Sequence, residues 1–471
     1  MGNIIDYLNW RGDLTFSQAP FNQIDALLLS SLSYADFGGI VPGPDDPDDE
    51  ITLAAASDLF FEMHSQEELD ADKSFINWAP TILRGMAGSA RFKNAVLKNY
   101  IDIVDTMSSL QFSAIEIITD DGVPFISYRG TDDTVVGWKE DFNLSFETVP
   151  AEAVSVTYLN RVQKSTGTPV RIGGHSKGGH LAVCAAALCT RTIRDRIESI
   201  YNFDGPGFNK MFIQNGALDK ITSRVRRVIP VSSFIGVLLV HKVDPRVVKS
   251  TAMGLNQHNP MTWDVIGADF TEAPERGKTS ILFESTFNDW IDSIDLRDRE
   301  SFVNDLFSVL EASGEPHLSH IGERGMKAYT SMLGKLNTLT PKTRDAVISL
   351  LKLLFSQWVE KQGYSIRKTL HLPIGEAAAE EEAYKTDCRI RKQDVYMDDI
   401  AVDALHIPSS RALMRQSVHE SLKKNFRDVS SAVNAQNEGS GGFRPTSPLI
   451  ITTVLYCIRS TGHSSPSLFF L

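Results

Sequence analysis

The chain has 471 residues, of which 42% are hydrophobic and 23% charged, and its formal net charge is −12. This length holds one large domain with insertions or two to three ordinary ones, and the composition is ordinary for a globular protein. The negative charge argues against nucleic acid as a partner, because neutralising phosphates takes a concentrated basic face, and it gives little attraction to an anionic bilayer.

Signals for secretion, membrane insertion and metal binding are lacking in the sequence. The N-terminus has no cationic start, and no apolar run reaches the roughly 18–20 residues that a transmembrane helix needs. None of the four cysteines has zinc-type spacing. We therefore expect a cytoplasmic protein with no transmembrane segment, metal or cofactor, and we leave transient membrane contact open.

In chain order, the first elements are a helix over residues 22–36 and, after a loop rich in Pro and Asp, helical patterns up to about residue 110. Two β runs follow, 112–118 and 123–128, joined at Asp121-Gly122. Runs joined at Asp-Gly are a hairpin signal, so the sequence predicts an antiparallel pair here.

From residue 151 onward, helical and β patterns alternate. The helical patterns cover 151–164 and 177–190, and the β runs cover 169–173, 200–203, 225–229, 234–240 and 247–249. Alternation of this kind predicts βαβ units and a mostly parallel sheet, hence an α/β fold.

The sharpest chemical signal lies between the run 169–173 and the helical pattern that follows, in Gly174-His175-Ser176-Lys177-Gly178. A serine hydroxyl becomes a useful nucleophile only on a sharp exposed turn, beside a base and near donors for an oxyanion. Glycines two residues before and after the serine let a strand turn tightly into a helix. The context favours a nucleophile at Ser176 over a glycine-rich turn that binds phosphate or merely packs.

This segment resembles the nucleophile region of the class-three lipases, which usually carry Leu where this chain has Lys177. Residues 128–131 (Tyr-Arg-Gly-Thr), with Trp138 and Asp141 behind them, resemble another motif of those lipases. Residues 204–208 and 257–263 look closer still to a bacterial lipase-like family of uncharacterised function. The resemblance covers roughly residues 20–370 and implies an α/β-hydrolase fold, a mostly parallel sheet flanked by helices.

Oxyanion donors in such folds are the backbone N–H after the nucleophile and one from an earlier strand–loop junction. Lys177 is the first of these, and the resemblance implies Thr131 as the second, with its hydroxyl as a further donor. We interpret Asp141 as support for the loop behind Thr131, and Trp138 as a core residue.

The base should follow the acid in the chain, because α/β-hydrolases run in the order Ser, acid, His. His258 lies on a loop after the last β run, where a catalytic histidine belongs. We interpret His241 as a strand-end residue with a solvated tip, and His175 and His180 as packing or helix-face residues.

The acid is harder to place. In the class-three lipases it precedes a Val-Pro at a strand end, but the matching segment here, residues 226–230, begins with two arginines. Asp204 follows the strand after the nucleophile helix, at the sheet edge where ligands gather. We expect Asp204 to be the acid, with Asp244 as the alternative.

The sequence therefore predicts a serine hydrolase that cleaves a small-molecule or lipid carboxylic ester through an acyl-enzyme on Ser176. Thioester or amide cleavage by the same serine is an alternative, because the fold does not fix the leaving group. A catalytically silent fold that serves as a binding or scaffold protein is another, motivated by the arginines at the usual acid position.

Four parts are expected along the chain. An N-terminal segment, 1–20, precedes the hydrolase domain, 21–282. A helical region, 283–375, would form either a lid or an outer layer of the hydrolase. The remainder, 376–471, contains a Gly/Ser-rich linker and is interpreted as peripheral, with its disorder left open.

Overall fold

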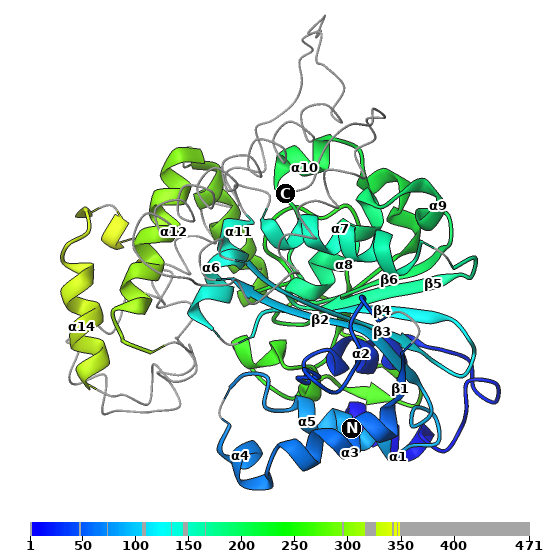
Figure 1. Cartoon of the computed structure of the whole chain (residues 1–471). Coiled ribbons are helices and arrows are strands. Elements are labelled where there is room, and N and C mark those ends of the chain that lie inside the picture. Colours follow the sequence, from blue (N-terminus) through cyan, green and yellow to red (C-terminus); the bar gives the residue numbers. More distant parts are fainter. Residues whose placement is uncertain are drawn as a thin grey trace, which may run out of the picture. The chain divides into compact units, whose positions relative to one another are not determined.

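The computed structural model describes residues 2–46, 49–72, 74–105, 110–132, 134–144, 149–164, 166–293, 296–315, 326–341, 343–345 and 347–348. The expected tail, 376–471, and residues 349–375 of the expected helical region lie outside the described residues. The centre of the described part is an eight-stranded sheet whose strands follow one another in chain order, with helices on both faces (Figure 1).

The sheet is antiparallel in its first half and parallel in its second. The antiparallel strands are β1 (Ile51–Thr52), β2 (Val96–Asp105), β3 (Leu110–Ile118) and β4 (Pro124–Tyr128). The strands that continue it in parallel from β4 are β5 (Val170–His175), β6 (Ile197–Phe203), β7 (Val225–Pro230) and β8 (Arg246–Val248). All four parallel pairs point their carboxyl ends to one edge, and the loops at that edge carry the candidate site.

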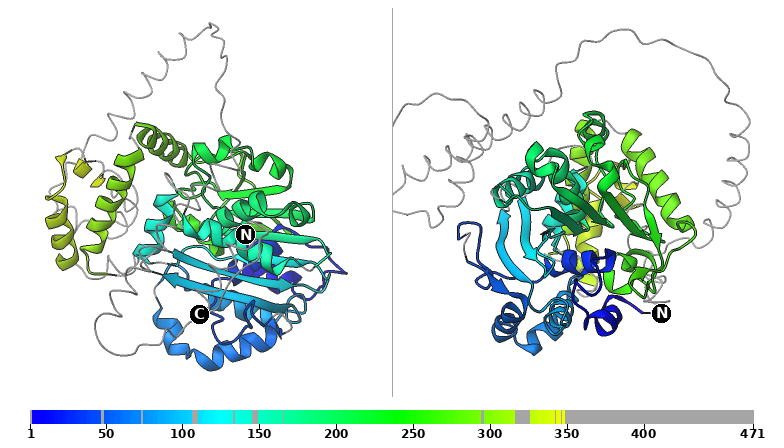
Figure 2. Two further views of the ribbon diagram at one scale, coloured as in Figure 1. Left: turned by 45° about the horizontal axis from the view of Figure 1, so that its top comes forward. Right: turned by 90° about the vertical axis from the view of Figure 1, so that its right-hand side faces the viewer.

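Two layers of helices cover the sheet, as Figures 1 and 2 show from different sides. On one face, α7 (Pro150–Val162) and α8 (Lys177–Leu188) pack side by side. The other face is covered by α2 (Gln23–Leu32), which contacts β4, β5 and β6. The fold is therefore a mixed α/β structure with a mostly parallel sheet flanked by helices, as the sequence predicts.

The remaining elements are short or lie outside these two layers. The helices are α1 (Ile4–Arg11), α3 (Leu53–Met63), α4 (Gln66–Ala71), α5 (Ala79–Ala87), α6 (Val135–Asn143), α9 (Arg191–Arg194) and α10 (Lys210–Gln214). The 3-10 turns cover Leu218–Lys220, Thr222–Arg224, Gly254–His258 and Pro260–Thr262, and a second small sheet pairs β9 (Val265–Ile266) with β10 (Asp269–Phe270).

The N-terminal residues are built into the main core. Ile4, Tyr7 and Leu8 of α1 are buried in the same apolar cluster as Phe16 and most of α2. Two capping boxes, at Asn3 and Asn22, fix the starts of α1 and α2. Packing is thus continuous across the boundary expected at residue 20.

Two expected elements are wrong. Residues 96–105, expected to be helical, form strand β2. Their alternation is broken by a register shift between Lys98 and Ile101 and by Asn99, which has a φ of 55°. Residues 234–240, expected to be a strand, form turns and bends, because the backbone there pairs with the loop after β6 through a single bridge, between Phe208 and Val240.

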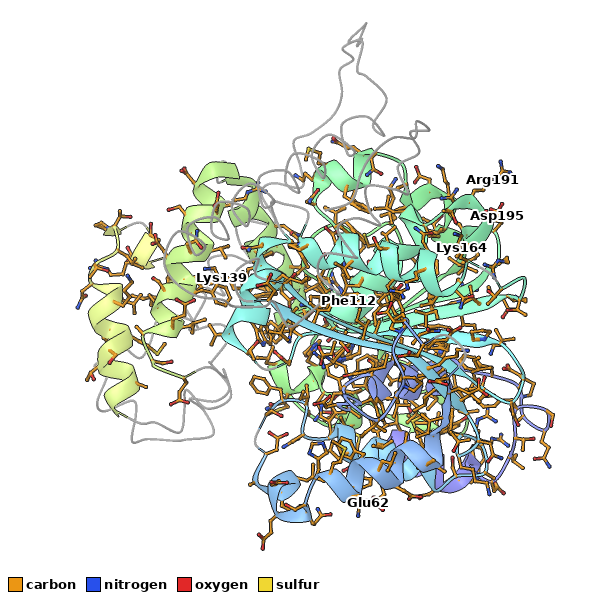
Figure 3. All side chains as sticks on the ribbon, in the orientation of Figure 1. Glu62, Phe112, Lys139, Lys164, Arg191 and Asp195 are labelled. Atoms are coloured by element: carbon orange, nitrogen blue, oxygen red, sulfur yellow. The ribbon has the colours of Figure 1, made fainter. Side chains whose placement is uncertain are left out.

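The helical region beyond the sheet consists of α11 (Lys278–Ser293), α12 (Leu296–Glu311) and α14 (Met326–Leu336). Phe302, Val303 and Leu306 of α12 pack with Val135 of α6 in an apolar cluster of their own. Among the described residues, no helix is long and apolar enough to cross a membrane. Apolar and charged side chains occupy different places in the fold. In Figure 3, Phe112 lies inside the sheet layer, whereas Arg191 and Asp195 lie at the outer surface.

Candidate active site

Ser176 sits on a sharp turn between β5 and α8. Its backbone adopts φ 57° and ψ −136°, a region that non-glycine residues rarely occupy and that costs of order 1–3 kcal/mol. The turn closes only because its flanking residues lack a side chain: a Cβ on Gly174 would lie 2.2 Å from the carbonyl carbon of Gly178. This is the strained strand–turn–helix geometry of a nucleophile elbow.

The loop after β4 lies directly against this turn. A Cβ on Gly178 would lie 2.0 Å from the carbonyl oxygen of Tyr128, and a Cβ on Gly130 would lie 3.0 Å from the Cβ of Ser176. Two hydrogen bonds from one side chain hold this loop in place. Arg129 forms a two-pronged ion pair with Asp102 of β2 at 2.8 and 2.9 Å. The loop that contains Thr131 is thereby held beside Ser176.

The hydroxyl of Thr131 donates to Oδ2 of Asp141 at 2.9 Å, so it is turned toward α6. This contact fits the interpretation of Asp141 as support for the loop. It also uses the single hydroxyl proton of Thr131, so the expectation that this hydroxyl is a further oxyanion donor is wrong. Burial raises the pKa of Asp141 to about 6, against the opposing effects of Lys177 and the Thr131 hydroxyl.

Lys177, the residue after Ser176, has a fully buried side chain. Its Nζ forms an ion pair with Glu140 of α6 at 2.7 Å, and both side chains are only 1% exposed. It also donates to the backbone oxygen of Gln111 at 3.2 Å. A buried lysine requires such compensation, because an unpaired buried charge costs several kcal/mol. The side chain of Lys177 is therefore held by Glu140 and Gln111.

The structure brings Asp204 and His258 together. Oδ2 of Asp204 lies 2.7 Å from Nδ1 of His258, and the Asp204 side chain is 1% exposed against 19% for His258. Since a carboxylate only accepts, Nδ1 carries the proton and Nε2 is left with a free lone pair, the tautomer that a general base needs. Asp244, the alternative acid, is exposed.

His175, the residue before Ser176, connects the loop that carries His258 to the turn that carries Ser176. Nε2 of His175 lies 2.8 Å from the backbone oxygen of His258, and its Nδ1 lies 3.1 Å from the hydroxyl of Tyr34. Burial lowers the pKa of His175 well below its usual range, and the nearby His258 adds to this. His175 is thus a neutral donor that ties the two parts of the site together.

Ser176 and His258 lie at the same edge, but they are not joined by a hydrogen bond among those of the described residues. The ring of His258 lies 4.5 Å, between centroids, from the ring of His175, which immediately precedes the serine. Catalytic hydrogen bonds are often long before substrate binds and tighten in the complex.

Three other expectations concern residues around the site. Trp138 packs partly buried against the apolar cluster of α12, in keeping with its interpretation as a core residue. The interpretation of His241 was wrong: its Nε2 is buried and without a hydrogen-bond partner, so its tip is not solvated. His180 is buried, with its ring on Phe208 and its Nε2 3.0 Å from Glu152.

Several residues that shape the site escaped the sequence analysis. Asp102 lies on strand β2, which was expected to be helical. Glu140 lies next to Asp141, which was singled out because its stretch resembles a motif of the class-three lipases. Ser233, whose hydroxyl donates to Asp204, lies between the two segments expected to be strands, 225–229 and 234–240. Only the unusual Lys177 offered a signal, because a lysine at a position usually held by Leu calls for a buried acidic partner.

Among the described residues, no group of three or more His, Cys, Asp or Glu side chains is arranged to hold a metal ion.

A serine on a strand–helix turn, with an aspartate and a histidine on later loops at the carboxyl edge of a mostly parallel sheet, is the arrangement typical of α/β-hydrolases. Residues 86–308 match the model of the family described as Mbeg1-like. That stretch contains Ser176, Asp204 and His258, so the part of the chain that carries the candidate site is the part that is similar to this family.

Comparison with solved structures gives a likeness to a chain described as M37 lipase, with 16% sequence identity and a TM-score of 0.26. The match covers 37% of this chain and 70% of that chain. Comparison with curated proteins gave no match.

Proposed function

We propose that the protein is a serine hydrolase of carboxylic esters that works through an acyl-enzyme on Ser176. The observation that carries the proposal is the 2.7 Å contact between Asp204 and Nδ1 of His258, at the same sheet edge as a serine with φ 57°. The first gives a histidine the tautomer of a base, and the second gives a serine the strained backbone of a nucleophile elbow.

The reaction follows from these positions. Oγ of Ser176 attacks the ester carbonyl carbon, and its proton passes to Nε2 of His258, whose positive charge the buried Asp204 stabilises. The backbone N–H groups of Lys177 and Thr131 hold the negative oxygen of the tetrahedral intermediate. His258 then gives its proton to the departing alcohol, and a water molecule activated by the same histidine releases the acid and regenerates the serine.

Labelling with a fluorophosphonate probe tests the nucleophile. The folded protein should be labelled at Ser176, and Ser176→Ala should abolish both labelling and the hydrolysis of p-nitrophenyl esters. A protein that stays unlabelled, or an Ala variant with undiminished esterase activity, would instead make the chain a catalytically silent binding or scaffold protein.

The acid and the substrate class are tested separately. Asp204→Asn should lower kcat by about three to four orders of magnitude, because the histidine loses its tautomer, whereas Asp244→Asn should behave like the parent. Equal activity of both variants would contradict the assignment of the acid. A panel of p-nitrophenyl esters of increasing chain length would then show whether the substrate is a long-chain lipid ester or a short-chain ester.

A further inference from the structure

The segment between β7 and β8 folds against the acid of the candidate site. The hydroxyl of Ser233 donates to Oδ1 of Asp204 at 2.5 Å, while Oδ2 of the same carboxylate faces Nδ1 of His258 at 2.7 Å. Ser233 and Asp204 are both buried. Each oxygen of a fully buried carboxylate thus has its own side-chain donor.

Ser233 is the donor to Asp204, because a carboxylate oxygen only accepts, and the same hydroxyl accepts from a second partner. The backbone N–H of Gly236 donates to Oγ of Ser233 at 3.0 Å, and the hydroxyl has a single proton to give. Position 236 admits no side chain, because a Cβ there would lie 2.3 Å from Oδ1 of Asp204 and 2.8 Å from Cγ2 of Ile229. The turn can therefore approach the carboxylate closely only with glycine at that position.

A buried arginine holds this turn from behind. Arg227 of β7 is 7% exposed and donates to the backbone oxygens of Gly236 at 2.6 Å and Val243 at 3.1 Å. Burial lowers the pKa of Arg227 to about 10, and the negative charge of Asp204 works against that lowering. The arginine that stands near the expected acid position thus provides a cation close to the acid that this chain uses.

We propose that Ser233 is a positioning residue of the active site, which locks the carboxylate of Asp204 in the orientation that His258 requires, and that Arg227 supports it through Gly236. The proposal rests on the proposed function of Ser176, His258 and Asp204. A carboxylate held at both oxygens cannot rotate about its Cβ–Cγ bond without breaking one contact. Ser233 does not touch the substrate, so its effect reaches the reaction only through Asp204.

The experiment uses the full chain and compares Ser233→Ala with Ser232→Ala, which removes a hydroxyl one residue earlier. Steady-state hydrolysis of p-nitrophenyl butyrate and the rate of fluorophosphonate labelling are measured for both. The downfield proton resonance of His258 Nδ1, assigned by its loss in His258→Gln, reports the Asp204–His258 contact without reference to activity.

Ser233→Ala should lower kcat about tenfold, the loss expected for one hydrogen bond to a charged group, and leave KM within about twofold. Its Nδ1 proton resonance should shift or broaden, and Ser232→Ala should match the parent in both respects. Gly236→Ala, which pushes a methyl group onto Asp204, should show the same pattern more strongly. Arg227→Met should also lower kcat, as Ser233→Ala does.

If the parent reacts with the probe but Ser233→Ala matches Ser232→Ala in kcat and resonance, the positioning role is refuted while the hydrolase remains. If the parent neither reacts nor hydrolyses, the proposed function fails, and the resonance alone then decides whether Ser233 orients the pair. Should Ser233→Ala not fold, Ser233→Cys takes its place, because a thiol fills the position but donates weakly.

Discussion

At the scale of single residues, two side chains of the candidate site sit on left-handed backbone. Ser176 has a φ of 57° and Asp204 a φ of 52°, and each directly follows one of the neighbouring parallel strands β5 and β6. Such conformations persist only when the surroundings hold them in place. Here the backbone N–H of Ser176 donates to Phe203 and that of Asp204 to Val228, so each turn is fastened to the next strand of the sheet.

The buried pair of Lys177 and Glu140 predicts a non-additive effect on stability. Lys177→Met should lower the free energy of unfolding by about 3–5 kcal/mol, because it leaves Glu140 buried without its cation. The double variant Lys177→Met/Glu140→Met should recover most of that loss, since no uncompensated charge remains. Urea denaturation of the single and double variants measures the difference, and a double variant that is as unstable as the two singles combined would contradict it.

Asp141 predicts a pH-dependent contribution to stability. Because burial raises its pKa to about 6 in the folded protein, the folded state binds more protons than the unfolded state between about pH 4 and 6. The stability that Asp141 contributes is therefore present below about pH 4 and is lost as the pH rises to about 6.

Asp141→Asn removes this titration. The free energy of unfolding of the variant minus that of the parent should rise between pH 4 and pH 7, by up to roughly 3 kcal/mol for a shift of this size. Denaturation series at pH 4.0, 5.0, 6.0 and 7.5 measure it. A difference that stays flat over this range would show that Asp141 titrates as an ordinary carboxyl group.

At the scale of elements, helix α8 approaches strand β4 so closely that only glycine fits between them. Gly178→Ala would place a methyl group 2.0 Å from the carbonyl oxygen of Tyr128, a backbone atom that cannot swing away. We expect a loss of at least about 3 kcal/mol in the free energy of unfolding, since either the helix or the loop beside Ser176 must move.

The matched control for that change is Gly167→Ala. Gly167 is exposed, and a Cβ there would meet nothing within 4 Å. Thermal denaturation should place this variant close to the parent and Gly178→Ala well below both. Equal melting temperatures for the two variants would mean that the turn yields without cost.

At the scale of the whole described molecule, Arg91 fastens the N-terminal residues to the sheet layer. It pairs with Asp25 of α2 in an ion pair whose side chains are both 0% exposed. It also donates to the backbone oxygen of Ala19 at 2.9 Å and to that of Leu14 at 3.0 Å. One guanidinium thus closes the loop between α1 and α2.

Arg91→Met should therefore destabilise the protein by about 3–5 kcal/mol, because it strands the charge of Asp25 in the core. Limited proteolysis should at the same time cut sooner between α1 and α2. The control is Arg191→Met, which breaks an ion pair to Asp195 whose side chains are 86% and 61% exposed (Figure 3). An exposed pair of this kind contributes about 0–1 kcal/mol, so a comparable loss in both variants would contradict the role given to Arg91.

Local chemistry decided much of the architecture. The hairpin at Asp121-Gly122, the helix α8 and the parallel strands around it follow from turn residues and hydrophobic periodicity, which act over a few neighbouring positions. The elbow at Ser176 was recognisable for the same reason, since its glycines, strand and helix are contiguous in sequence. Strand β2 was not recognisable in the sequence, because its bulge interrupts the alternation of apolar and polar residues by which strands are recognised.

The partners of the site were decided by the tertiary structure alone. The sequence favoured Asp204 as the acid with Asp244 as the alternative, and the structure places Asp204 2.7 Å from His258 across 54 residues of chain. Nothing in the sequence indicated that Ser233 would reach Asp204, that His175 would hold the loop of His258, or that Glu140 would meet Lys177. Each of these contacts joins segments far apart in the chain, and such pairs are set by how strands align at one sheet edge rather than by any local preference.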